Sequence, residues 1–209
     1  MVDVLGYFQK GGPVMYLLLV CSVAVAAIGI ERYRFYRYAE RGSESFLERL
    51  AEVLKGSALD RAREVCSEEH SALGGVASAG VEAAARGEDV ELALDVAYSD
   101  AAMRLRANLN YLSMIVTLAP LLGLLGTISG MIESFSIFNL QAGQPLAITG
   151  GIGEALVATA TGLCVAIFAL IVHTYFAQRL DESLAVLERA CAIVLGGARR
   201  RDGGSSHAA

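Results

Sequence analysis

Hydroxyl side chains recur along one uncharged stretch of the sequence at a spacing that could do chemistry. Residues 107–132 contain no Asp, Glu, Lys or Arg. Within and just beyond this stretch, alternating steps of four and three residues connect Ser113, Thr117, Pro120, Leu124, Thr127, Met131 and Ser134. Such steps keep side chains on one face of a helix. The hydroxyls therefore form a stripe that either lines a polar path or bonds to the helix backbone and holds helices together.

A carboxylate, Glu154, lies near the start of another apolar stretch, residues 148–178. Helical spacing places Glu154 and Thr161 on one face, with Thr159 beside it. A carboxylate inside a bilayer costs roughly 2.5–3.5 kcal/mol on insertion scales, so it usually faces a cavity or a partner. We expect these three residues to line a polar lumen or a partner-binding surface suited to protons or cations. The alternative is that Glu154 lies at the outer interface, where the helix dipole favours an acid.

The elements that must position these residues are membrane-spanning helices. A bilayer core about 30 Å thick needs roughly 20 apolar residues in helical form. The stretches that meet this requirement are residues 11–31, 107–138 and 148–178. A cleaved signal peptide is the alternative for the first stretch, but its preceding residues are nearly neutral and Arg and Tyr follow it directly. We therefore predict an all-α membrane protein with three transmembrane helices, the second and third long and extending into a helical cytoplasmic region.

Small residues in the second and third spans predict where helices pack closely. Gly126 and Gly130 form a pair of small residues one helical turn apart, which lets two helix backbones approach. We assign Gly123 and Gly162 to the same packing role. Glycine and proline are more frequent in membrane helices than in soluble ones, so Pro120 does not argue against a span.

The distribution of Lys and Arg predicts the orientation. The flank before span one has only Lys10, and the loop between spans two and three has no basic residue. The flanks predicted to be cytoplasmic carry Arg32, Arg34, Arg37, Arg41, Arg104, Arg106, Arg179, Arg189 and residues 199–201. Residues 1–10 and 139–147 are thus expected outside. Residues 32–106 are expected inside as a helical loop and helix extension, and residues 179–209 as a helix and a disordered tail.

The loop of residues 32–106 reads as short amphipathic helices. Leu47, Leu50 and Leu54 form one apolar stripe at helical spacing. Breaks are expected at Gly74-Gly75 and at Gly87. From Asp89 onward the pattern predicts one long helix that continues into span two. No enzymatic motif is recognisable, so we predict a protein that is not an enzyme.

Composition excludes several other classes. Apolar residues make up 55% of the chain and charged residues only 19%, and the charges are segregated from the apolar stretches. A net charge of −5 argues against nucleic-acid binding, which needs a basic face. Four cysteines without paired spacing predict neither a disulfide nor a metal site, and no cofactor is expected.

Two motifs resemble those of one family. Residues 118–132 (LAPLLGLLGTISGMI) look like the second-span signature of the ExbB/TolQ/MotA proton-channel family, and residues 151–163 (GIGEALVATATGL) resemble its third-span signature. The spans, the large first cytoplasmic loop and the short outer loop also match short ExbB-type members. Phe168 stands where many members have proline, and His173 stands where a tyrosine is common.

The resemblance implies a bacterial inner-membrane protein that forms a homopentamer around the single membrane helices of two ExbD- or TolR-like partners. Each partner would bring an intramembrane Asp. The family uses proton-motive force to drive motion of the partner, and a TonB- or TolA-like protein carries that work to the outer membrane. By motif position, Thr127 and Thr159 would be lumen-facing threonines and Glu154 the lumen acid. Thr161 joins them through helical geometry alone. A scaffold that holds a partner helix without conducting is the alternative, and a secondary transporter is disfavoured because no inverted repeat is visible.

Overall fold

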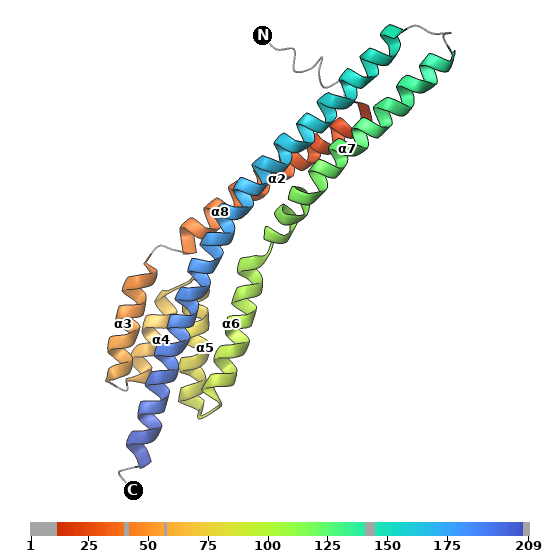
Figure 1. Cartoon of the computed structure of the whole chain (residues 1–209). Coiled ribbons are helices and arrows are strands. Elements are labelled where there is room, and N and C mark those ends of the chain that lie inside the picture. Colours follow the sequence, from red (N-terminus) through yellow and green to blue (C-terminus); the bar gives the residue numbers. More distant parts are fainter. Residues whose placement is uncertain (1–11, 40–41, 57, 141–144, 207–209) are drawn as a thin grey trace. The chain divides into compact units, whose positions relative to one another are not determined.

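The computed structural model describes residues 12–39, 42–56, 58–140 and 145–206, and all regular structure within these ranges is helical (Figure 1). The predicted outer segment 1–10 and residues 141–144 of the predicted outer loop lie outside the described residues. The helices, in chain order, are α2 (Gly12–Ala39), α3 (Ser43–Lys55), α4 (Leu59–Glu68), α5 (Ala72–Arg86), α6 (Val90–Arg106), α7 (Leu109–Leu140) and α8 (Pro145–Ser206). This result confirms the predicted all-α class.

Among the described residues, three helical stretches are long and apolar enough to cross a membrane, as predicted. They are Gly12–Arg37, Val90–Ser136 and Gly150–Arg201. The chain divides into two compact units, which we describe separately. The apolar unit comprises Met1–Glu31 and Asn108–Phe176, and the short-helix unit comprises Arg32–Ala107 and Ala177–Ala209.

The apolar unit contains parts of α2 and α8 together with α7. Pro120 lies inside α7 without ending it, as expected for a membrane helix. Large apolar side chains face outward on all three helices, including Val20, Leu121 and Ile171, each more than 60% exposed. An apolar surface of this extent suits lipid or other membrane helices.

The expected continuous helix from Asp89 into span two is wrong, because Asn108 interrupts it. α6 ends at Arg106, and Asn108 adopts a left-handed backbone with φ of 66° before α7 begins. Asparagine tolerates this conformation better than most residues. Within the apolar unit, the Asn108 side-chain amide donates to the Glu31 carboxylate at 2.8 Å.

The short-helix unit has a core of long apolar side chains. Along the chain, α3 contacts α4, α4 contacts α5, and α5 contacts α6. The predicted stripe on α3 is confirmed, since Leu47, Leu50 and Leu54 are buried. A Cβ placed on Gly197 of α8 would lie 3.1 Å from the Leu54 Cβ, so α8 closes the core beside α3.

Two predicted boundaries in this unit need correction. Gly74 and Gly75 do not break the chain but lie in the first turns of α5. A Cβ on Gly74 would collide with the carbonyl oxygen of Glu69, so only glycine, which has no Cβ, fits at this position. Gly87 does end α5, with φ of 68°. The tail expected to be disordered from residue 203 is helical to Ser206, since α8 extends by one backbone hydrogen bond per residue once formed.

Candidate functional site

The two family-like motifs meet in the contact between α7 and α8 of the apolar unit. The glycines predicted to pack helices all lie in this contact, namely Gly123, Gly126, Gly130 and Gly162. A Cβ added to Gly126 would lie 2.5 Å from the Ala158 Cβ, and one added to Gly162 would lie 2.7 Å from the Ala119 carbonyl oxygen. Both separations are shorter than the 3.0 Å that real Cβ contacts respect. Only glycine therefore lets the two backbones approach this closely.

Thr159 forms a polar contact across this interface. Its hydroxyl donates to the Gly123 carbonyl oxygen of α7 at 2.9 Å. The Gly123 carbonyl oxygen thereby has a second possible donor, in addition to a backbone amide of its own helix. Thr159 thus lies in the α7–α8 contact of one chain and is half-buried there.

The other threonine hydroxyls donate along their own helices. Thr127 donates to the Leu124 carbonyl at 2.6 Å, and Thr161 donates to the Val157 carbonyl at 2.8 Å. A hydroxyl that donates once keeps its acceptor lone pairs. Both side chains are half-buried, so both oxygens can still accept from a water or a partner.

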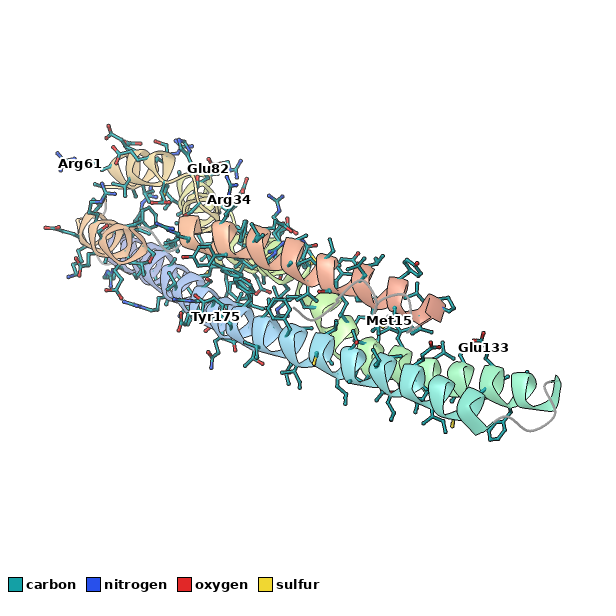
Figure 2. The ribbon with its side chains drawn as sticks, turned by 90° about the horizontal axis from the view of Figure 1, so that it is seen from above. Met15, Arg34, Arg61, Glu82, Glu133 and Tyr175 are labelled. Carbon is teal, nitrogen blue, oxygen red and sulfur yellow. The ribbon has the colours of Figure 1, made fainter. Side chains whose placement is uncertain are left out.

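A small cavity brings acidic side chains together at one end of the apolar unit. Its volume is about 30 Å³, and it is lined by the first residues of α2, by Ser129 and Glu133 of α7, and by Glu154 of α8. Figure 2 shows Glu133 and Met15 toward this same end of the unit. A cavity of this volume holds a water molecule when polar groups line it. The arrangement can therefore join two carboxylates and a hydroxyl through water.

The structure does not gather all predicted residues into one place. Glu154 lines the cavity and is exposed. The residues lining the cavity do not include Thr127, Thr159 or Thr161. Among the described residues, no group of three or more His, Cys, Asp or Glu side chains could hold a metal ion.

Glu133 is the residue that sequence reasoning missed. It follows directly after the uncharged residues 107–132 and lies inside the predicted span 107–138, but it was not among the predicted site residues. A signal was present, because Gly126, Gly130 and Glu133 follow steps of four and three. Glu133 therefore shares the helix face of the glycine pair, and that face contacts α8.

Comparisons with known proteins agree with the two motifs. A family model described as the MotA/TolQ/ExbB proton channel family matches residues 67–189. A Synechocystis protein named biopolymer transport protein ExbB-like 1 is 35% identical over 191 residues, covering 86% of this chain and 74% of that protein. An ExbB homolog of Methanothermobacter thermautotrophicus is 28% identical over 188 residues, covering 88% and 67%. The Tol-Pal system protein TolQ of Pseudomonas aeruginosa is 35% identical over 122 residues, covering 53% of each chain.

Proposed function

Because this chain belongs to the MotA/TolQ/ExbB proton channel family, we propose that it is the proton-channel and stator subunit of an inner-membrane energy-transducing complex. The complex would be of the ExbB–ExbD–TonB or TolQ–TolR–TolA type and would use proton-motive force for transport or envelope work at the outer membrane. The observation that carries the proposal is the α7–α8 pair. Glycines bring the two family-like motifs into contact there, and Glu154 lies at one end.

The assembly we propose is a pentamer of this chain around the single membrane helices of an ExbD- or TolR-like partner. The exposed apolar side chains of α7 and α8, such as Leu121 and Ile171, give such neighbours a surface to contact. The partner would supply an intramembrane Asp. The amino terminus would lie outside and the carboxyl terminus in the cytoplasm, as the positions of Lys and Arg favour.

Each polar residue has a role in this proposal. Glu154 accepts and releases protons toward the outer side. Thr127, Thr159 and Thr161 offer oxygen atoms to water along the lumen, because their hydroxyls keep lone pairs after donating to backbone carbonyls. In this proposal the residues pass protons and hold water without converting a substrate, so the protein is a channel subunit and not an enzyme.

The proposal is tested by proton flux into liposomes that contain the chain and its partner. Glu154→Gln removes the titratable group with almost no change of shape, and Thr127→Val replaces a hydroxyl by a methyl group. We expect both variants to assemble and to lose most of the partner-dependent flux. Full flux in both assembled variants would contradict the assignment of these residues to the lumen.

Glu133 provides a graded test of the same path. Glu133→Gln leaves Glu154 in place, so we expect a several-fold loss of flux rather than abolition. The conservative Glu133→Asp should restore most of the flux, because it keeps a carboxylate on the cavity. Equal flux in the wild type and Glu133→Gln would exclude Glu133 from the path.

The second candidate is a scaffold that holds a partner helix without conducting. The observation that favours it is that Thr127 and Thr161 both donate to their own helix backbone, as structural hydroxyls do. A scaffold would assemble with the partner and give no flux above that of empty liposomes. The flux measurement on the wild type therefore separates the two functions.

A further inference from the structure

A groove lies between α6 and α8 of the short-helix unit, away from the residues proposed to carry protons. Its volume is about 320 Å³, which is within the range of binding pockets. Leu94 of α6 and Ala192 and Leu195 of α8 supply its apolar lining. The groove therefore has both the size and the apolar lining to receive side chains from another molecule.

Acidic side chains also line this groove. Glu91 and Asp95 come from α6 and Glu188 from α8. Arg199 pairs with Glu91 at 3.3 Å, and the Tyr98 hydroxyl donates to Glu188 at 3.1 Å. Among the ion pairs of the described residues, none involves Asp95 or Glu188. The groove thus keeps an excess of negative charge.

Exposed apolar side chains extend the surface beside the groove. Leu92 and Val96 follow Glu91 and Asp95 on α6 and are 63% and 59% exposed. They are four residues apart, so they lie on one face of the helix. An occupant would therefore meet acids within the groove and apolar side chains beside it. An amphipathic helix with basic residues has the matching pattern.

We propose that the α6–α8 groove receives the basic, amphipathic cytoplasmic segment of the single-span partner. This inference rests on the proposed function, which supplies the partner and places the groove on the cytoplasmic side. A single-span protein carries its excess of Lys and Arg on the cytoplasmic flank of its membrane helix. The charge of that flank is opposite to that of Asp95 and Glu188, and complementary charge fixes register and selects the partner.

The test is a binding measurement on the whole chain in nanodiscs of zwitterionic phosphatidylcholine, which lacks the negative charge that would attract a basic probe. The probe is a fluorescein-labelled amphipathic helix of Leu and Lys, and its counterpart carries Glu in place of Lys. Fluorescence anisotropy reports binding. We expect the Leu/Lys peptide to bind and the Leu/Glu peptide not to bind.

Charge-neutral variants locate the site. The double variant Asp95→Asn with Glu188→Gln should weaken binding of the Leu/Lys peptide at least about tenfold, since close charge pairs dominate such contacts. The control is Asp60→Asn with Glu64→Gln on α4, where both residues are exposed and outside the groove. It changes the net charge equally and should leave binding unchanged. Equal weakening by both double variants, or none by the groove variant, would overturn the proposal.

A second copy of this chain is the competing occupant, and a cross-link detects it. If a photoreactive benzoylphenylalanine placed at Ala192 cross-links to a second copy of the chain in the membrane and the Leu/Lys peptide does not prevent it, the groove is covered by a neighbouring copy and the proposal is wrong. Peptide binding needs no proton movement. Flux without peptide binding would therefore reject the groove assignment alone, whereas peptide binding without flux would reject the channel function.

Discussion

The two units of this protein bury their contacts in opposite ways. In the short-helix unit, long side chains such as Phe46 and Leu50 are fully buried, as in a water-soluble domain. In the apolar unit, the contact between α7 and α8 is made by glycine and alanine, while large side chains such as Leu121 face outward. Packing by small residues is how helices associate where lipid removes the hydrophobic driving force. The comparison shows that one unit packs as a water-soluble domain does, whereas the other packs as a membrane protein does.

The helix starts differ in the same way. In the short-helix unit, α3, α4 and α6 each carry an acid in the first turn. The first turns of α2, α7 and α8 carry none. An acid near a helix start is stabilised by the helix dipole. Helices α3, α4 and α6 thus begin as those of soluble proteins do, whereas α5 and the three long apolar helices have no acid in the first turn.

The largest effect we expect is on the reactivity of a cysteine in the short-helix unit. Burial raises the pKa of the Cys66 thiol from 9.0 to about 11. At pH 8 this lowers the reactive thiolate fraction about a hundredfold, since the thiolate is the nucleophile. Alkylation of Cys66 followed by peptide mass spectrometry should therefore be about a hundredfold slower in the folded chain than in the unfolded chain.

The pH dependence gives the sign of this effect. The folded pKa is raised, so the unfolded chain loses the Cys66 proton first as pH rises above 9. The contribution of Cys66 to stability is therefore full below pH 9 and falls as pH approaches 11. Equally fast alkylation in the folded and unfolded chains would mean that this core is open to water.

The next largest effect is on the stability of the core of the short-helix unit. Leu50 is fully buried on α3, and Leu50→Ala should lower the free energy of unfolding by about 2–5 kcal/mol, since it removes buried methyl groups and leaves a cavity. Leu92→Ala is the matched control, because Leu92 is 63% exposed and should change stability by less than about 0.5 kcal/mol. Denaturation of both variants, followed by circular dichroism, measures the difference. Similar losses in the two variants would contradict the soluble-type core.

The positions of the membrane-crossing helices could be predicted from sequence because they depend on length and apolar content alone. The buried stripe on α3 was also predictable, since Leu47, Leu50 and Leu54 share one face at helical spacing. The break at Asn108 was not. Its left-handed backbone accompanies a hydrogen bond to Glu31, a residue distant in sequence, and a local pattern carries no information about that partner.

The candidate site, too, has one part that could be predicted from sequence and one part that could not. The glycines of the α7–α8 contact follow a spacing that predicts close packing, and the structure has them at that contact. The meeting of Glu133 with Glu154 in one cavity depends on how α2, α7 and α8 pack. Sequence spacing showed the helix face of Glu133 but not the element opposite it. Helix pairing across long stretches is what single-sequence reasoning could not supply.

A substitution in the small-residue contact of the apolar unit should have an intermediate effect on stability. Gly126→Ala would bring a methyl group to 2.5 Å from the Ala158 Cβ, and neither carbon can rotate away because both are fixed to helix backbones. We expect a loss of about 1–3 kcal/mol, which is typical of overpacking. Gly153→Ala is the control, since a Cβ there meets nothing within 4 Å. Unfolding in mixed micelles compares them, and a stable Gly126→Ala variant would show that the α7–α8 contact is looser than described.

The smallest effect concerns the start of α6. The Asp89 carboxylate accepts from the backbone amides of Glu91 and Leu92 at 3.0 and 3.1 Å, so Asp89→Ala leaves both amides to water. The expected loss is about 1 kcal/mol. Asp89→Asn keeps the accepting oxygen and should cost much less. If Asp89→Asn were as destabilising as Asp89→Ala, the carboxylate charge rather than the cap would stabilise α6. The helix start would then depend on the dipole, and its stability would fall with added salt.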